Sequence, residues 1–200
     1  SVGSIYTNYS PHKIETDQYV EFDFKIYNKI VEAFYHDLEL GPNTTIKGRI
    51  ETNEKNFNLT FNSPHIKLKD YFANDLSVLV DNSNPVFNTY IEIDSLSTNF
   101  YNVSDFSLIN VTQRDTLFIK SEFKGGKQNT DNYDLNLFYT INQDQNSVIG
   151  FRKSDITFKG NDWTINEEKN NANKITFDRH LVSFDIDKII MTHFGEQIEL

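Results

Sequence analysis

The sequence has no cysteine among its 200 residues. Disulfide frameworks, thiolate nucleophiles and cysteine-bound zinc are therefore excluded. No apolar run approaches the roughly 18 to 20 residues that a membrane-spanning helix needs. The sequence patterns of dinucleotide-binding loops, P-loops and serine-hydrolase elbows are also absent. We accordingly expect a protein that is not an enzyme and that uses no cofactor.

Positive charge is scarce. The chain has 19 Lys and Arg against 29 Asp and Glu, which gives a net charge of −10 at pH 7. Nucleic-acid binding needs clustered basic side chains, so we expect no nucleic-acid partner. The same charge disfavours peripheral binding to anionic lipid headgroups, and it keeps a strand-rich protein soluble.

Apolar residues are plentiful, at 38% of the chain with 14% aromatic. They occupy every second position between Val20 and Ile26, between Phe57 and Phe61, and in the later segment 135–141. A period of two places each apolar set on one face of a strand. Breaks rich in Asn, Asp and Gly at 81–85, 125–129, 142–146, 160–162 and 170–173 are typical of turns. The pattern predicts an all-β, antiparallel meander of many short strands.

One segment has helical spacing instead. Ile30, Phe34 and Leu38 recur at intervals of four residues, and Gly41-Pro42 follows as a stop signal. We therefore predict a short amphipathic helix over residues 27–38, whose apolar stripe packs on the neighbouring strands.

Few residues carry recognisable chemistry. The histidines have no helical metal-pair spacing, so we expect no metal site; they are His12, His36, His65, His180 and His193. Asp185 and Asp187 share one side of a strand and could bind calcium or act as an acid/base pair. Their place opposite Phe184 and Ile186 favours a plain solvent face. Trp163 could belong to an aromatic platform that binds glycans. It shares a strand face with apolar residues such as Ile and Leu, however, which favours a place in a core or a groove.

The order of these elements resembles that of TamB-like proteins, in the wider AsmA-like envelope group. Residues 45–50 look like that family's Ile-x-Gly-x-hydrophobic strand, and the alternating segment 57–61 follows. Residues 62–68 are similar to its Ser-Pro-x-Ile step, and residues 174–190 are similar to its closing passage. The resemblance covers roughly residues 19–200.

This resemblance implies a long sheet that curves into a taco-like open trough with an apolar interior. Its members are anchored in the inner membrane of Gram-negative bacteria and cross the periplasm to an outer-membrane assembly-factor barrel. They are implicated in phospholipid transport and outer-membrane protein assembly. The expected ligands are therefore phospholipid or acyl chains. The barrel would be reached through a C-terminal region of the parent protein that is not in this segment.

We expect residues 1–18 to be irregular or a partial strand at the edge of the segment, and 19–200 to form a single repetitive β-trough. Because the chain starts at Ser1 without a signal peptide and stops in a strand-like stretch, we expect a piece of a longer exported protein. The side chains expected to line the groove share the apolar parity of their strands; they are Phe22, Phe24, Phe57, Leu59, Phe61, Ile66, Leu68, Ile91, Ile93, Leu117, Ile119, Leu135, Leu137, Ile156, Phe158, Trp163, Ile165, Ile175 and Phe177. Ile30, Phe34 and Leu38 are expected to plug or cap it.

A sheet with one apolar face cannot leave that face in water. It must pack a second sheet, close into a barrel, take a helix or hold a ligand. Besides the lipid trough, the sequence therefore leaves open a compact β-sandwich that serves as an adhesin or glycan-binding module.

Overall fold

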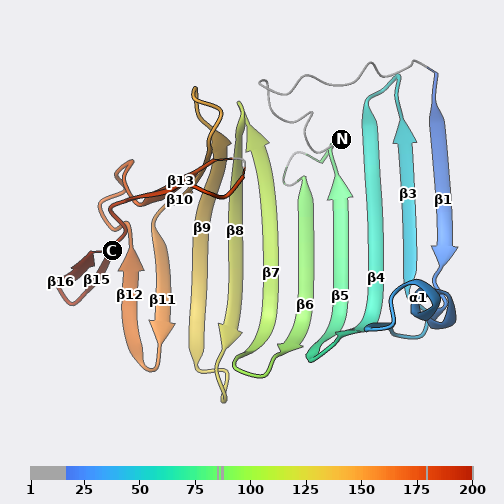
Figure 1. The fold of residues 1–200 in the computed structure, drawn as a ribbon, viewed down its shortest axis with the longest axis horizontal. Helices are drawn as coiled ribbons and strands as arrows, with labels where there is room; N and C mark the ends of the chain where they lie inside the picture. Colours follow the sequence, from blue (N-terminus) through green and yellow to red (C-terminus); the bar gives the residue numbers. More distant parts are fainter. Residues whose placement is uncertain (1–16, 85, 87, 179, 200) are drawn as a thin grey trace. The chain divides into compact units, whose positions relative to one another are not determined.

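The computed structural model describes residues 17–84, 86, 88–178 and 180–199. Its strands form one open sheet of sixteen, with the main order β1-β3-β4-β5-β6-β7-β8-β9-β11-β12-β15-β16 (Figure 1). The elements are β1 (Tyr19–Lys25), α1 (Asn28–Phe34), β2 (Leu38–Leu40), β3 (Thr45–Glu51), β4 (Asn56–Leu68), β5 (Tyr71–Asp81), β6 (Thr89–Ser97), β7 (Asn102–Gln113), β8 (Thr116–Gly125), β9 (Asp131–Ile141), β10 (Ser147–Phe151), β11 (Ser154–Phe158), β12 (Asn161–Ile165), β13 (Lys174–Phe177), β14 (Phe184–Asp187), β15 (Ile190–His193) and β16 (Glu196–Glu199). This confirms the predicted all-β antiparallel meander.

The chain divides into two compact units. Within the described residues, the N-terminal unit holds 17–109 and 123–129, and the C-terminal unit holds 110–122 and 130–199. Strands β7 and β8 contribute residues to both. The predicted irregular stretch 1–18 lies outside the described residues except for Asp17 and Gln18, which precede β1.

Register in the N-terminal unit places apolar residues opposite one another across five strands. Phe24 of β1 pairs with Ile46 of β3, which pairs with Phe61 of β4, then Val78 of β5 and Ile91 of β6. Directly opposed residues of antiparallel strands share a face, so this is one continuous apolar row.

Strand β4 is shared by two partners on the same edge. Its first half pairs with β3, and its last residues 66–68 pair with the short β2. At the fork, the fully buried hydroxyls of Thr44 and Ser63 lie 2.8 Å apart. Each is also within 2.7 Å of a backbone carbonyl, that of Gly41 or His65. The two carbonyls also accept backbone N–H groups, those of Thr44 and Gly41 respectively, so the hydroxyls add second hydrogen bonds at the fork.

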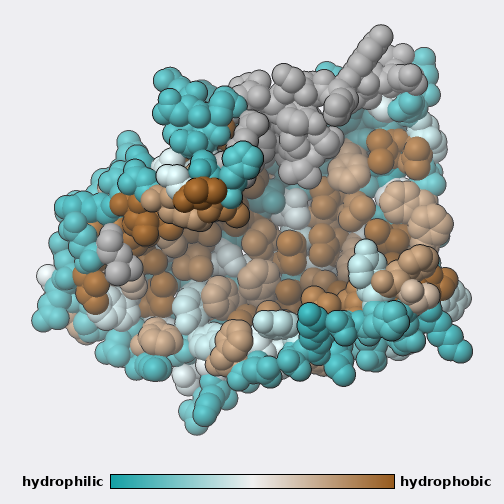
Figure 2. Space-filling view, in the orientation of Figure 1, coloured by the Kyte–Doolittle hydropathy of each residue, from teal (hydrophilic) through white to brown (hydrophobic). Residues whose placement is uncertain are grey.

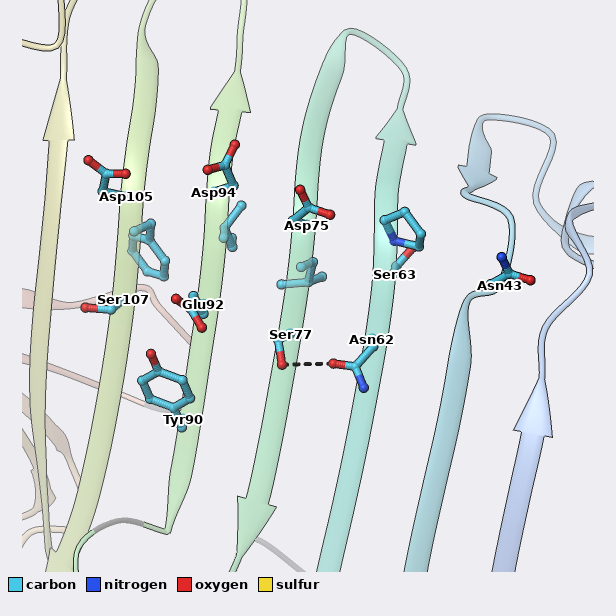
Figure 3. A pocket seen from close by; sticks show the side chains of 14 residues that line it. Asn43, Asn62, Ser63, Asp75, Ser77, Tyr90, Glu92, Asp94, Asp105 and Ser107 are labelled. Atoms are coloured by element: carbon cyan, nitrogen blue, oxygen red, sulfur yellow. Dashed lines mark hydrogen bonds between the residues drawn. The ribbon is translucent and has the colours of Figure 1, made fainter.

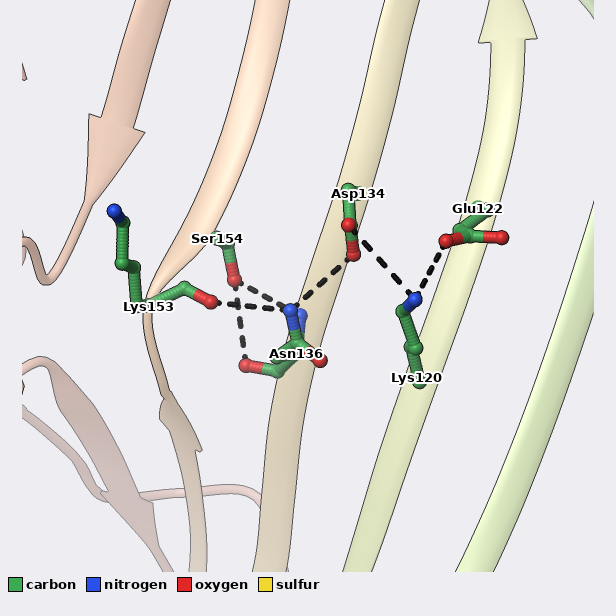
Figure 4. Close-up of polar contacts among 6 residues, drawn as sticks. All are labelled: Lys120, Glu122, Asp134, Asn136, Lys153 and Ser154. Carbon is green, nitrogen blue, oxygen red and sulfur yellow. Dashed lines mark hydrogen bonds and ion pairs between the residues drawn. The ribbon is translucent and has the colours of Figure 1, made fainter.

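A second fork lies on β9. Residues 137–141 pair with β10 and residues 132–134 pair with β11, so the sheet continues as two branches. Between them the Asn136 N–H donates to the buried Ser154 Oγ at 2.9 Å, and the Asn136 amide donates to the Lys153 carbonyl at 3.1 Å (Figure 4). One branch is β10-β13-β14 and the other is β11-β12-β15-β16.

Buried asparagine side chains form hydrogen bonds to the backbone of the segments that connect the strands of these branches. The Asn173 side chain accepts the Ile190 N–H at 2.6 Å, and the Asn166 amide donates to the Phe151 carbonyl at 2.7 Å. Both asparagines are buried. The Asn-rich stretch 170–173 therefore contributes a fixed structural joint in addition to a turn.

The helix is shorter than predicted. It ends at Phe34, because Tyr35 leaves the helical region with φ −138° and ψ 92°. Leu38 is drawn into β2, where it pairs with Leu68; pairing with β4 outweighs local helical propensity. Ile30 and Phe34 are 59% and 76% exposed, so the expected packing of the apolar stripe on the strands is wrong. No helix among the described residues is long and apolar enough to cross a membrane.

The β9 fork yields a test. We expect Ser154→Ala to lower the free energy of unfolding by about 1–3 kcal/mol, because the half-buried Asn136 N–H loses its acceptor. Urea unfolding measures the change. The control Ser97→Ala, on an exposed position of β6, should shift stability by no more than about 0.5 kcal/mol. If both substitutions lowered the free energy of unfolding equally, the role assigned to Ser154 at the fork would be wrong.

Candidate functional site: an apolar sheet face

The candidate site is one face of the N-terminal unit, which we call the apolar face. Its members point to the same side of strands β1 and β3–β6; they are Val20, Phe22, Phe24, Ile46, Ile50, Phe57, Leu59, Phe61, Leu76, Val78, Val80, Ile91 and Ile93. Figure 2 shows apolar side chains gathered over these strands, with hydrophilic ones along the lower margin.

No layer of described residues covers this face. Among them only Leu40, Val148, Ile165 and Ile189 are buried apolar side chains, and none belongs to the apolar face. Phe24 is 59% exposed, and its neighbours in the row are half-buried. Strand pairing thus shields the flanks of these side chains and leaves their outer surface open.

Gly48 shapes the middle of the apolar face. It lies opposite Phe22 in the ladder, and a Cβ added to it would come within 2.5 Å of Phe22 Cζ. The Phe22 ring therefore lies across the glycine, and it also stacks on Phe24 with ring centroids 5.4 Å apart. An aromatic ring over a strand glycine is a known device of β-sheets. It gives a physical reason for the Ile46-x-Gly48-x-Ile50 pattern.

The opposite face of the same strands is polar. Lys47 Nζ lies 2.8 Å from Asp23, and Arg49 lies 2.7 Å from Glu51. These pairs are largely exposed, so they add little stability. Their effect is to keep one side of the sheet wetted while the other stays apolar.

A hollow of about 790 Å³ lies on this polar face (Figure 3). It forms where regular pairing is interrupted, because Asp75 and Asp105 adopt left-handed φ of 47° and 52° inside their strands. Its lining is acidic, with Glu92 and Asp94 beside them, while Asp105 pairs with Lys124 at 2.9 Å. No group of three His, Asp or Glu residues within the described ranges could hold a metal.

The predicted lining residues divide between several places. Phe22, Phe24, Phe57, Leu59, Phe61, Ile91 and Ile93 all lie on the apolar face. Ile66 and Leu68 lie beyond the β4 fork, opposite Leu40 and Leu38. Sequence reasoning missed Leu76, Val78 and Val80, because the run 78–80 is apolar throughout and hides the period of two.

In the C-terminal unit the predicted residues lie on both branches. Ile156 pairs with Trp163, Leu137 with Phe151, Ile175 with Ile186, and Phe177 with Phe184. Ile165 is buried, Phe158 is exposed, and Leu117, Ile119 and Leu135 are half-buried in β8 and β9.

Trp163 belongs to an aromatic cluster. Its ring stacks on His193 at 4.8 Å, and His193 meets the exposed Phe194 edge-on at 4.5 Å. His193 Nδ1 lies 2.5 Å from the Asp162 carbonyl, which fixes the ring.

The carboxylates at positions 167, 168, 185 and 187 are all exposed. Asp185 and Asp187 are exposed, and Asp187 pairs with Lys174 at 3.4 Å. Glu167 accepts a hydrogen bond from Thr192 at 2.6 Å, and Glu168 is exposed.

A charged cluster lies on the C-terminal unit beside the β9 fork. Lys120 lies 2.6 Å from Glu122 and 3.9 Å from Asp134 (Figure 4). The hydrogen bond to Glu122, with help from Asp134, raises the pKa of Lys120. The lysine therefore stays charged at neutral pH, as part of a solvated ion-pair cluster.

Comparison with known proteins adds no relative. No protein-family model matches the chain, and searches of curated proteins and of solved structures find no match. The described residues define the class of fold alone: an open, antiparallel sheet whose apolar face is covered by none of them.

The glycine contact yields a double-mutant test. We expect Gly48→Val to destabilise the protein by about 1–3 kcal/mol, because the new side chain displaces the Phe22 ring. In a Phe22→Ala background the same change should be nearly neutral, since a β-branched residue suits a strand. Urea unfolding of the four proteins measures a coupling of about 1 kcal/mol or more. If the two substitutions changed the free energy of unfolding additively, the Phe22 ring would not be constrained by contact with residue 48.

Proposed function

We propose that this chain is a segment of a TamB-like, envelope-spanning periplasmic protein whose apolar face carries phospholipid acyl chains between the inner and outer membranes. The observation that supports it most is the row from Phe24 to Ile91, which crosses five strands without a polar residue and without a layer of described residues over it. Support for outer-membrane protein assembly belongs to the same proposal.

The energetics suit transport without chemistry. Removing an acyl chain from water is worth about 0.8 kcal/mol per CH₂, so a whole chain is worth on the order of 10 kcal/mol. Moving the acyl chain from a bilayer interior to an apolar sheet face changes its free energy little by comparison. A continuous face therefore removes most of the aqueous barrier, and it needs no precisely placed polar group.

The polar face supports this interpretation. Its ion pairs keep the sheet hydrated on one side, so a bound acyl chain has only one side to occupy. A compact β-sandwich, the alternative, needs a closed core. The described residues bury only four apolar side chains, which favours the open face over the sandwich.

The remainder of the proposal comes from the order of motifs along the chain. It places the parent protein in the periplasm of a Gram-negative bacterium, with an inner-membrane anchor. An outer-membrane assembly-factor barrel would be its partner, reached through a region outside this segment.

A pair of variants tests the ligand and its face. Leu59 lies on the apolar face and Thr60 lies on the polar face, one residue away on β4. We expect Leu59→Asp to weaken binding of a phospholipid with a fluorescent acyl chain by about tenfold or more, because a carboxylate must be desolvated beside the chain. Thr60→Asp adds the same charge and should change affinity by less than about twofold.

Fluorescence titration gives the affinities, and circular dichroism confirms that both variants fold. Mass spectrometry of organic extracts of the purified wild-type chain should detect bound lipid. No bound lipid, together with equal affinities of the two variants, would overturn the proposal.

A further inference from the structure

Strand β14 ends the branch β10-β13-β14, and its outer edge has no strand partner among the described residues. Along an antiparallel ladder, hydrogen-bonded pairs alternate with non-bonded pairs. The Asn173 carbonyl accepts the Phe151 N–H of β10 at 2.8 Å, so the next N–H, that of Lys174, faces β14. The Asp178 N–H donates to the Ser183 carbonyl at 3.3 Å, two residues beyond the pair of residues 176 and 185, in the same phase. The backbone groups of Asp185 and Asp187 therefore face β13, and those of Phe184 and Ile186 face outward.

Exposed apolar side chains follow this open edge. Leu181, Val182, Phe184 and Ile186 are 60%, 81%, 59% and 56% exposed. Isolated exposed apolar residues are ordinary, but a contiguous group marks an interaction surface. We call these four residues the edge strip.

The edge strip is held in place by one carboxylate. Asp178 accepts the backbone N–H groups of His180 at 2.9 Å, Val182 at 3.0 Å and Ser183 at 3.2 Å. The hydrogen bond from Val182, followed by those from His180 and Ser183, lowers the pKa of Asp178. Leu181 is held at φ +57°, a conformation that a leucine rarely adopts. The apolar tip is thus preorganised, which lowers the entropy cost of binding a partner.

Charge alternates with the apolar residues of the strand. Asp185 and Asp187 project from the face opposite Phe184 and Ile186. Asp187 is already paired with Lys174 at 3.4 Å, whereas Asp185 has no ion pair among the described residues. A fourth strand laid on this edge would meet apolar side chains on one face and negative charge on the other.

We propose that the edge of β14 binds an extended segment of another polypeptide, in which apolar residues alternate with Lys or Arg. The outward backbone groups of Phe184 and Ile186 supply strand-to-strand hydrogen bonds, and the edge strip takes the apolar side chains. Asp185 selects the basic ones. This mode of strand addition takes affinity from the main chain and specificity from alternate side chains. It is independent of lipid binding on the N-terminal unit.

The test uses the chain with synthetic peptides of about eight residues, a length within the usual range for a strand. One alternates Val with Lys, one alternates Val with Glu, and a third has the Val–Lys composition in blocks. Amide hydrogen exchange by NMR reports the site. The Val–Lys peptide should slow exchange at Phe184 and Ile186, while Asp185 and Asp187, already bonded to β13, change little.

Calorimetry reports selectivity. The wild-type chain should bind the Val–Lys peptide about fivefold more tightly than the Val–Glu peptide, and Asp185→Lys should reverse this order. If Asp185→Lys fails to fold, Asp185→Asn should abolish the preference instead. The proposal is overturned if no peptide protects the amides of Phe184 and Ile186, or if the block peptide binds equally well. It is also overturned if protection arises from self-association at high protein concentration or from phospholipid alone.

Discussion

The ladder of backbone hydrogen bonds between antiparallel strands is the constraint on which the remaining features depend. Since each pair of opposed residues shares a face, the register alone assembles Phe24, Ile46, Phe61, Val78 and Ile91 into one row. A shift of one residue in any strand would turn its apolar set to the polar side. The apolar face is therefore a property of pairing across the sheet, and no single strand carries it.

A ladder this long must also change direction and partners without leaving backbone groups unpaired. Both forks have a buried serine beside the break: Ser154 accepts the Asn136 N–H, and Ser63 donates to the His65 carbonyl, which also accepts the Gly41 N–H. The second fork creates the short branch whose last strand, β14, has an open edge. One set of features thus explains both the continuous face of the N-terminal unit and the separate edge of the C-terminal unit.

The sequence predicted the strands and their faces well, because period-two alternation is a local signal. It predicted turns less accurately: the tight turn at Lys159-Gly160 has two positive φ values, of 50° and 78°, and begins one residue earlier than expected. The forks could not be predicted, since the choice of partner for β4 or β9 depends on residues distant in sequence. The same applies to Leu38, where long-range pairing replaced a locally favoured helix, and to the left-handed Asp75 inside a strand.

The central claim is that acyl chains lie on one face of the sheet and leave the other untouched. Val78 and Leu79 provide an internal comparison, because these two neighbouring aliphatic residues of β5 point to the apolar and polar faces respectively. The most direct measurement is the set of intermolecular nuclear Overhauser effects between an isotope-labelled acyl chain of a phospholipid and the methyl groups of the protein. The account predicts contacts to Val78 and Ile91 and none to Leu79. Equal contacts to Leu79, or none to Val78, would contradict it.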